Sequence, residues 1–143
     1  MVDDKWLNEY IDAWILHPLA GTPEGARALK AFIDFLSPDV RYEDVPTNAV
    51  FTGHEGIKDM CRAAYAWAPD LDHTILTRQT NGSMYAFETE WTGTNSKAMG
   101  GLPATGRRFE IRGISVGHVS NDDLVDEHRD YWDLSSFIRQ VGA

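Results

Sequence analysis

The sequence predicts an α+β fold in which a curved, mostly antiparallel sheet wraps around helices. Apolar residues recur at helical spacing over the first half of the chain, whereas from residue 70 they alternate with a period of two. The 143 residues fit one domain, so we treat residues 1–143 as a single unit. The concave face of such a sheet has room for a small ligand.

The composition and charge narrow the classes of partner. Apolar residues make up 43% of the chain and aromatic residues 11%, which is enough for a packed core. The net charge of −9 disfavours binding to nucleic acid or to anionic membranes, because both are negatively charged. The single cysteine, Cys61, excludes an internal disulfide and favours a reducing compartment. Since neither a membrane-spanning run nor a signal-peptide pattern is present, we expect a cytoplasmic protein.

Three helices are expected before residue 70. The first ends at Pro18, and the second begins at the N-cap Thr22 with Pro23 at its first position. Thr52 and Glu55 have the spacing of a capping box at the start of the third helix. The apolar stripe of the first helix comprises Trp6, Leu7, Tyr10, Ile11, Trp14 and Ile15.

Five strands and a short final helix complete the pattern. Asn81-Gly82 is typical of a hairpin turn between two of the strands. Helical spacing of Leu134, Phe137, Ile138 and Val141 predicts the final helix. The strands are expected over residues 40–45, 72–79, 83–91, 107–119 and 124–132.

Alternation along two of these strands gathers chemically reactive side chains on one face. In the last strand His128, Asp130 and Trp132 share a face, and in the first strand Tyr42 and Asp44 share one. If these faces line the concave side of the sheet, they form an acid/base site with an aromatic wall. The alternative is a polar strand end that faces solvent.

Two further carboxyls are candidates for the same pocket. Glu88 and Glu90 lie on the strand face opposite Phe87 and Trp91, and we assign this face to the pocket. Carboxyls that converge on an apolar pocket cannot all ionise at low cost, so one can donate a proton while another accepts one. The alternative is that the strand is turned over and both glutamates face solvent.

Small residues on the long strand also bear on the pocket. Gly113, Ser115 and Gly117 alternate on one face, where they leave room for a ligand or allow the sheet to bend. Among the inward helix residues, Trp67 is expected to contribute to the apolar wall. The five histidines show no metal-ligand spacing, and neither a nucleophile motif nor a phosphate loop is present, so we expect no metal and no cofactor.

Four segments in order resemble the SnoaL-like polyketide cyclases of the nuclear transport factor-like superfamily. They are residues 42–46, 52–57, 101–109 and 129–134. The resemblance implies a cone-shaped α+β barrel with an internal pocket and a homodimer formed through the outer sheet face. It also implies an acidic general acid/base in an intramolecular aldol-type ring closure without metal or cofactor, a role that Asp130 matches.

The chain also resembles limonene-epoxide hydrolase of the same superfamily. Tyr42 and Asp130 match that enzyme's tyrosine and activating aspartate, and Glu90 stands at its other aspartate. Asp44 replaces its asparagine and Glu88 its arginine, so the paired carboxylates would lack their cation. These departures favour cyclase or isomerase chemistry, with epoxide hydrolysis and a non-catalytic binding or dimerisation module as alternatives.

The resulting hypothesis is a cofactor-free acid/base enzyme acting on a small or polycyclic hydrophobic substrate. Asp130 is expected to move the proton, His128, Asp44 or Glu90 to assist it, and Tyr42 to donate to a developing oxyanion. The residues expected to contact the substrate are Trp67, Glu88, Ser115 and Trp132.

Overall fold

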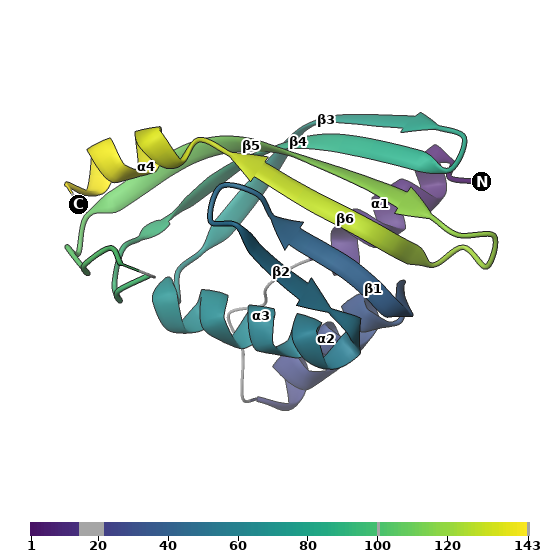
Figure 1. The fold of residues 1–143 in the computed structure, drawn as a ribbon, viewed down its shortest axis with the longest axis horizontal. Helices are drawn as coiled ribbons and strands as arrows, with labels where there is room; N and C mark the ends of the chain where they lie inside the picture. The colour runs from purple at the N-terminus through teal and green to yellow at the C-terminus, as the bar shows by residue number, and fades with distance from the viewer. Residues whose placement is uncertain (15–21, 100, 143) are drawn as a thin grey trace.

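The structure is a computed structural model that describes residues 1–14, 22–99 and 101–142. The predicted contribution of Ile15 and Pro18 to the first helix lies outside the described residues. The element order is α1 (Asp4–Ala13), α2 (Pro23–Ile33), β1 (Leu36–Asp44), β2 (Ala49–Thr52), α3 (Gly53–Trp67), β3 (Asp72–Asn81), β4 (Met84–Thr94), β5 (Arg108–Val119), β6 (Val125–Trp132) and α4 (Leu134–Val141) (Figure 1). None of the described helices is long and apolar enough to cross a membrane.

The strands form one mixed sheet in the order β2-β1-β6-β5-β4-β3. All neighbours are antiparallel except β1 and β6, which run parallel. This parallel pair aligns Tyr42 with His128 and Asp44 with Asp130, although the two strands are far apart in sequence. The α+β fold predicted from the sequence is confirmed, and β2 is an additional short strand.

Local signals explain most of the helix starts. Asp3 accepts a hydrogen bond from the Trp6 backbone N–H, and Thr22 does the same for Gly25, so each side chain caps a helix. The capping box predicted for α3 is wrong. Thr52 occupies the N-cap position, but its side chain makes no capping hydrogen bond, and Glu55 pairs with Lys58 instead.

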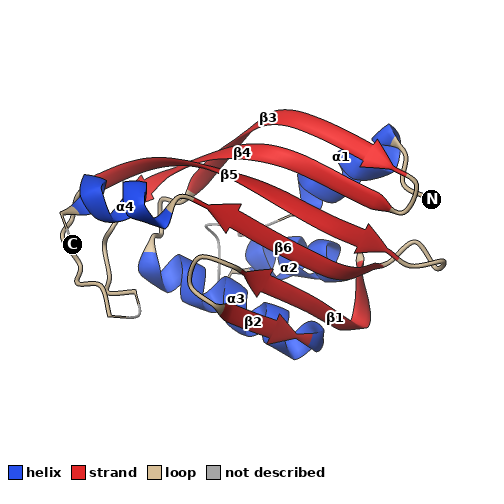
Figure 2. Cartoon of the chain, turned by 45° about the horizontal axis from the view of Figure 1, so that its top comes forward, coloured by secondary structure: helices blue, strands red, loops and turns tan. Residues whose placement is uncertain are grey.

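The main core fills the concave side of the sheet. Figures 1 and 2 show α1, α2 and α3 together on this side, with α4 at one end. Tyr85 and Phe87 of β4 pack there against Trp6, Tyr10 and Trp14 of the first helix and its C-cap. Each large side chain buried in this way contributes roughly 1.5–3 kcal/mol.

The face predicted for β4 is therefore wrong. Its aromatic residues point to the core, whereas Glu88 is exposed on the outer face. Because successive side chains of a strand point to opposite faces, either the aromatic residues or the glutamates face the core, and the other set faces outward. Burial of two aromatic rings lowers the free energy of the folded state, whereas burial of the carboxylates in their place would raise it.

A second apolar cluster closes the end of the molecule where α4 and the 95–107 segment meet. Trp67 and Phe109 stack there, and Phe137 meets both rings edge-on. Asn95 is buried and organises the segment, because it accepts a hydrogen bond from Trp67 Nε1 and donates one to the Pro103 carbonyl. Trp67 is thereby held at the boundary between this cluster and the pocket.

Candidate active site

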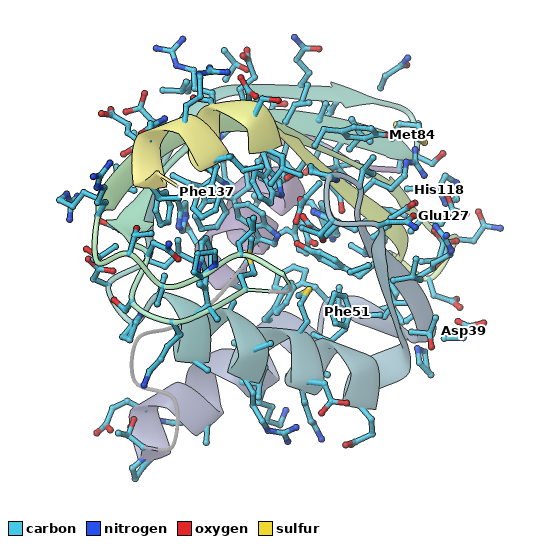
Figure 3. All side chains as sticks on the ribbon, turned by 60° about the vertical axis from the view of Figure 1, so that its left-hand side comes forward. Asp39, Phe51, Met84, His118, Glu127 and Phe137 are labelled. Atoms are coloured by element: carbon cyan, nitrogen blue, oxygen red, sulfur yellow. The ribbon has the colours of Figure 1, made fainter. Side chains whose placement is uncertain are left out.

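A pocket of about 600 Å³ lies between the sheet and α3. Polar groups gather at its β1–β6 side, and apolar side chains from α3, α4 and the 95–107 segment cover the rest. Figure 3 shows Phe51 and Phe137 among the interior side chains, while Asp39 and Glu127 project from the surface. The lining includes Tyr42, Asp44, Phe51, Met60, Trp67, Trp91, Leu102, Phe109, Ser115, Asp130 and Trp132.

Asp130 is the most heavily hydrogen-bonded carboxylate of the pocket. Its Oδ1 contacts Ser115 Oγ at 2.5 Å and His128 Nε2 at 2.8 Å, and its Oδ2 accepts from the Tyr42 hydroxyl at 2.7 Å. A carboxylate offers about four acceptor positions, two on each oxygen. Among the contacts of the described residues, one position on Oδ2 therefore remains free, and the Asp130 side chain keeps 20% exposure.

Tyr42 holds the oxygen that carries this free position. Its ring is buried and stacks on His128 with centroids 4.3 Å apart, and Trp14 Nε1 donates to its hydroxyl at 2.9 Å. Burial, and then the negative charge of Asp130, raise the pKa of Tyr42 well above its usual range. Its hydrogen therefore stays on the phenol and points to Asp130, so the predicted role as oxyanion donor finds no support in this geometry.

Asp44 is a second carboxyl in the pocket, with different partners. Trp132 Nε1 donates to its Oδ1 at 2.6 Å, and Thr47 Oγ1 donates to its Oδ2. Burial raises the pKa of Asp44, an effect that these hydrogen bonds oppose. The same contact fixes the Trp132 indole along the pocket wall, so Asp44 connects the acid/base end with the aromatic wall.

His128 lies behind Asp130 and does not line the pocket. Its side chain is fully buried, and its Nδ1 faces the hydroxyls of Tyr85 at 2.7 Å and Tyr10 at 3.1 Å. The alternation of His128, Asp130 and Trp132 predicted their shared face. The sequence did not predict that the two tyrosines bind His128. A tyrosine in an apolar stripe gives the same pattern whether its hydroxyl contacts a buried partner or water.

The two glutamates predicted for the pocket are not in it. Glu88 is exposed and accepts a hydrogen bond from Thr77, while Glu90 pairs with Arg112 at 3.4 Å on the outer face. The prediction that they face the pocket is wrong, for the reason given for β4. Trp67, Ser115 and Trp132, in contrast, line it.

The described part of the pocket thus differs from a hydrolase site with paired carboxylates around an arginine. The positions matched to that arginine and its aspartate, Glu88 and Glu90, point away from Asp130. Among the residues of the lining that the structure describes, none is a lysine or an arginine. Over the same described ranges, no three His, Cys, Asp or Glu side chains come together as a metal site.

The mixed, curved sheet around three helices defines a nuclear transport factor-like fold, with an internal pocket that carries carboxyls. The chain belongs to the SnoaL-like polyketide cyclase family, whose sequence model matches residues 24–141. A comparison with curated proteins gives no significant match.

Solved structures share the fold. TsrD from Streptomyces laurentii is 27% identical, with a TM-score of 0.79 over 100% of this chain and 99% of TsrD. IdmH from Streptomyces antibioticus, a candidate polyketide cyclase, is 20% identical, with a TM-score of 0.70 and 97% of both chains covered. A hypothetical protein with a ketosteroid isomerase-like fold from Catenulispora acidiphila is 20% identical, with a TM-score of 0.73 over 99% of this chain and 95% of that protein.

Proposed function

We propose that the chain is a cofactor-free acid/base enzyme in which Asp130 moves a proton on a hydrophobic, polycyclic substrate. One observation carries the proposal: Asp130 faces the pocket, and its contacts with the described residues, three hydrogen bonds, leave an acceptor position on Oδ2. Donors that hold a carboxylate in this way fix its direction. Such a group is suited to remove a proton from a carbon acid.

The reaction class is an intramolecular aldol-type closure or a proton shift. Asp130 Oδ2 takes a proton from the carbon next to a carbonyl, which gives an enolate and a protonated carboxyl. In a closure, the enolate carbon forms a bond to a second carbonyl carbon, and the resulting alkoxide receives a proton. Returning the Asp130 proton to that oxygen restores the enzyme without any oxidant or reductant.

The lining supports a neutral substrate with flat rings. Trp67, Phe109 and Trp132 supply aromatic surface, and a pocket of about 600 Å³ is within the size range of small-molecule sites. No cation is present among the described lining residues to pair with a carboxylate or phosphate of the substrate. Asp44 and Asp130 would repel such groups, since both are acidic.

The test is proton exchange in heavy water with neutral polycyclic ketones such as 2-tetralone and anthrone, followed by mass spectrometry. Wild type is expected to accelerate exchange, and Asp130→Asn to lose this activity while it keeps its fold. Glu88→Gln is the matched control, because this carboxyl lies on the outer face. Exchange by Asp130→Asn at the wild-type rate would overturn the assignment.

The same variants separate the two alternatives. Diol formation from limonene oxide that is lost in Asp130→Asn would favour epoxide hydrolysis, which the outward position of Glu88 and Glu90 does not favour. Binding of the ketones with equal affinity by wild type and Asp130→Asn, without exchange, would favour a non-catalytic binding module.

We also propose that a second copy of the chain covers the outer sheet face. Met84, Ile114 and Tyr131 alternate with inward residues on that face and are each about two-fifths exposed. Solvent-exposed apolar groups on neighbouring strands favour association. Light scattering should give the mass of a dimer, and Ile114→Glu should give that of a monomer; a monomeric wild type would contradict the proposal.

A further inference from the structure

A buried hydrogen-bond network lies behind Asp130. His128 Nε2 contacts Asp130 Oδ1 at 2.8 Å, and its Nδ1 contacts the Tyr85 hydroxyl at 2.7 Å and the Tyr10 hydroxyl at 3.1 Å. His128 and Tyr10 are fully buried and Tyr85 is 2% exposed. These groups have no access to water, so their hydrogens must be distributed among themselves.

The distribution that satisfies every hydrogen has a lone pair on Nδ1. Burial raises the pKa of both tyrosines, so both phenols keep their hydrogens, and the two hydroxyls also hydrogen-bond to each other. One phenol can then donate to the other, and the remaining hydrogen goes to Nδ1. A hydrogen on Nδ1 would leave one phenol hydrogen without an acceptor among the contacts of the described residues. A buried unsatisfied donor costs about 1–3 kcal/mol.

We infer that Tyr85 is a positioning residue that holds His128 with its hydrogen on Nε2, so that the imidazole donates to Asp130 Oδ1. This inference rests on the proposed function of Asp130. A permanent donor on Oδ1, together with Ser115, leaves Oδ2 as the oxygen that meets the substrate. Tyr85 lies closer to Nδ1 than Tyr10 does, so we assign the main effect to it.

Gly117 makes the contact of Tyr85 with His128 sterically possible. Tyr85, Gly117 and His128 are register partners on the adjacent strands β4, β5 and β6. A Cβ atom at position 117 would lie 2.2 Å from the Tyr85 hydroxyl, which is far inside van der Waals contact. The phenol therefore crosses the middle strand through the space of a missing side chain. The room that the sequence predicted beside Gly117 is filled by Tyr85, not by a ligand.

Removing the Tyr85 hydroxyl should loosen the imidazole. Nδ1 would lose its closer donor, at 2.7 Å, and keep only the Tyr10 hydroxyl, at 3.1 Å, among the contacts of the described residues. The ring would then be held less firmly, and so would the Asp130 carboxylate to which its Nε2–H donates.

The first readout is independent of turnover. Nitrogen NMR of histidine-labelled protein distinguishes a ring nitrogen that carries a hydrogen from one that does not. Wild type and Glu88→Gln should show His128 with its hydrogen on Nε2 and a hydrogen-bonded lone pair on Nδ1, because Glu88 lies on the outer face. Tyr85→Phe should keep the hydrogen on Nε2 but move the Nδ1 resonance towards that of a ring nitrogen without a hydrogen-bond donor. Wild-type protein with the hydrogen on Nδ1 would overturn the inference. This measurement does not depend on whether any variant folds.

The second readout is kcat and KM for proton exchange on 2-tetralone. Tyr85→Phe should lower kcat about tenfold or more and change KM less than about twofold, because the loss concerns the orientation of Asp130. Glu88→Gln should match wild type. A Tyr85→Phe variant with wild-type kcat, or with an unchanged Nδ1 resonance, would overturn the inference. Failure of the proposed function would be recognised separately, since Asp130→Asn would then exchange at the wild-type rate.

Discussion

Asp44 and Asp130 are register partners on the parallel strands β1 and β6, and both line the pocket, yet their surroundings differ. Asp130 contacts two hydroxyls and an imidazole, which suits a carboxylate that accepts protons. Asp44 is buried with its oxygens on an indole and a threonine, and burial raises its pKa. In the proposed function the two neighbouring acids therefore have separate roles, with Asp130 as the group that accepts the proton and Asp44 as the group that orients Trp132.

The stability of the protein should depend on Asp44 in a pH-dependent way. Folding raises the pKa of Asp44 above its ordinary value of 3.8, so the native state binds more protons than the unfolded state between the two values. The free energy of unfolding should therefore fall as the pH rises through that window. Asp44→Asn, which keeps an acceptor for Trp132, should stabilise the protein more at about pH 7 than at about pH 4.

Thermal unfolding of Asp44→Asn and Asp70→Asn at both pH values checks this prediction. Hydrogen bonds from Thr94 lower the pKa of Asp70, so Asp70→Asn should have the opposite sign, with a loss of stability at about pH 7 that disappears in acid. Equal shifts of the Asp44 variant at both pH values would contradict the prediction.

Ser115→Ala should loosen the orientation of the Asp130 carboxylate. The variant removes the 2.5 Å hydrogen bond from Ser115 to Oδ1 and leaves the other two partners. The maximum rate of proton exchange on 2-tetralone should fall about tenfold, because the carboxylate is held less firmly in the direction that the reaction needs. Ser120→Ala, in the turn after β5, is the control and should keep the wild-type rate.

Tyr42→Phe should affect stability and catalysis together. The hydroxyl donates to Asp130 and accepts from Trp14 Nε1, so its loss leaves a buried indole N–H without a partner. We expect a loss of about 1–3 kcal/mol in the free energy of unfolding, measured by denaturant titration. The exchange rate should also fall, whereas Glu88→Gln on the outer face should keep the wild-type rate. A variant as stable as wild type would show that another group satisfies Trp14.

Gly113→Ala should destabilise the protein where β5 borders the pocket. A Cβ atom at this position would lie 2.5 Å from the Tyr131 carbonyl oxygen and 3.1 Å from Trp132 Cβ. Since backbone atoms cannot move aside cheaply, we expect a loss of roughly 1–3 kcal/mol. Gly101→Ala is the matched control, because no atom lies within 4 Å of its added Cβ. Denaturant titration of both variants should separate them, and equal stabilities would contradict the steric argument.

The sequence by itself determined the fold class and the strand face that carries Asp130. Helical and two-residue periods distinguish the N-terminal helices from the later strands, because burial repeats with the period of each element. Alternation also placed His128, Asp130 and Trp132 on one face, and the motifs pointed to Asp130. These signals are local, so they survive without knowledge of the tertiary structure.

Only the tertiary structure decided which face of β4 is buried and what lies behind Asp130. Glu88 and Phe87 alternate in the same strand, and the pattern alone does not say which set meets the helices. Packing decides it, since the aromatic face fills the core and the glutamates remain in water. The pairing of Tyr85 with His128 across Gly117 likewise depends on three strands meeting in register, and such a meeting is a property of the folded sheet, not of any one segment.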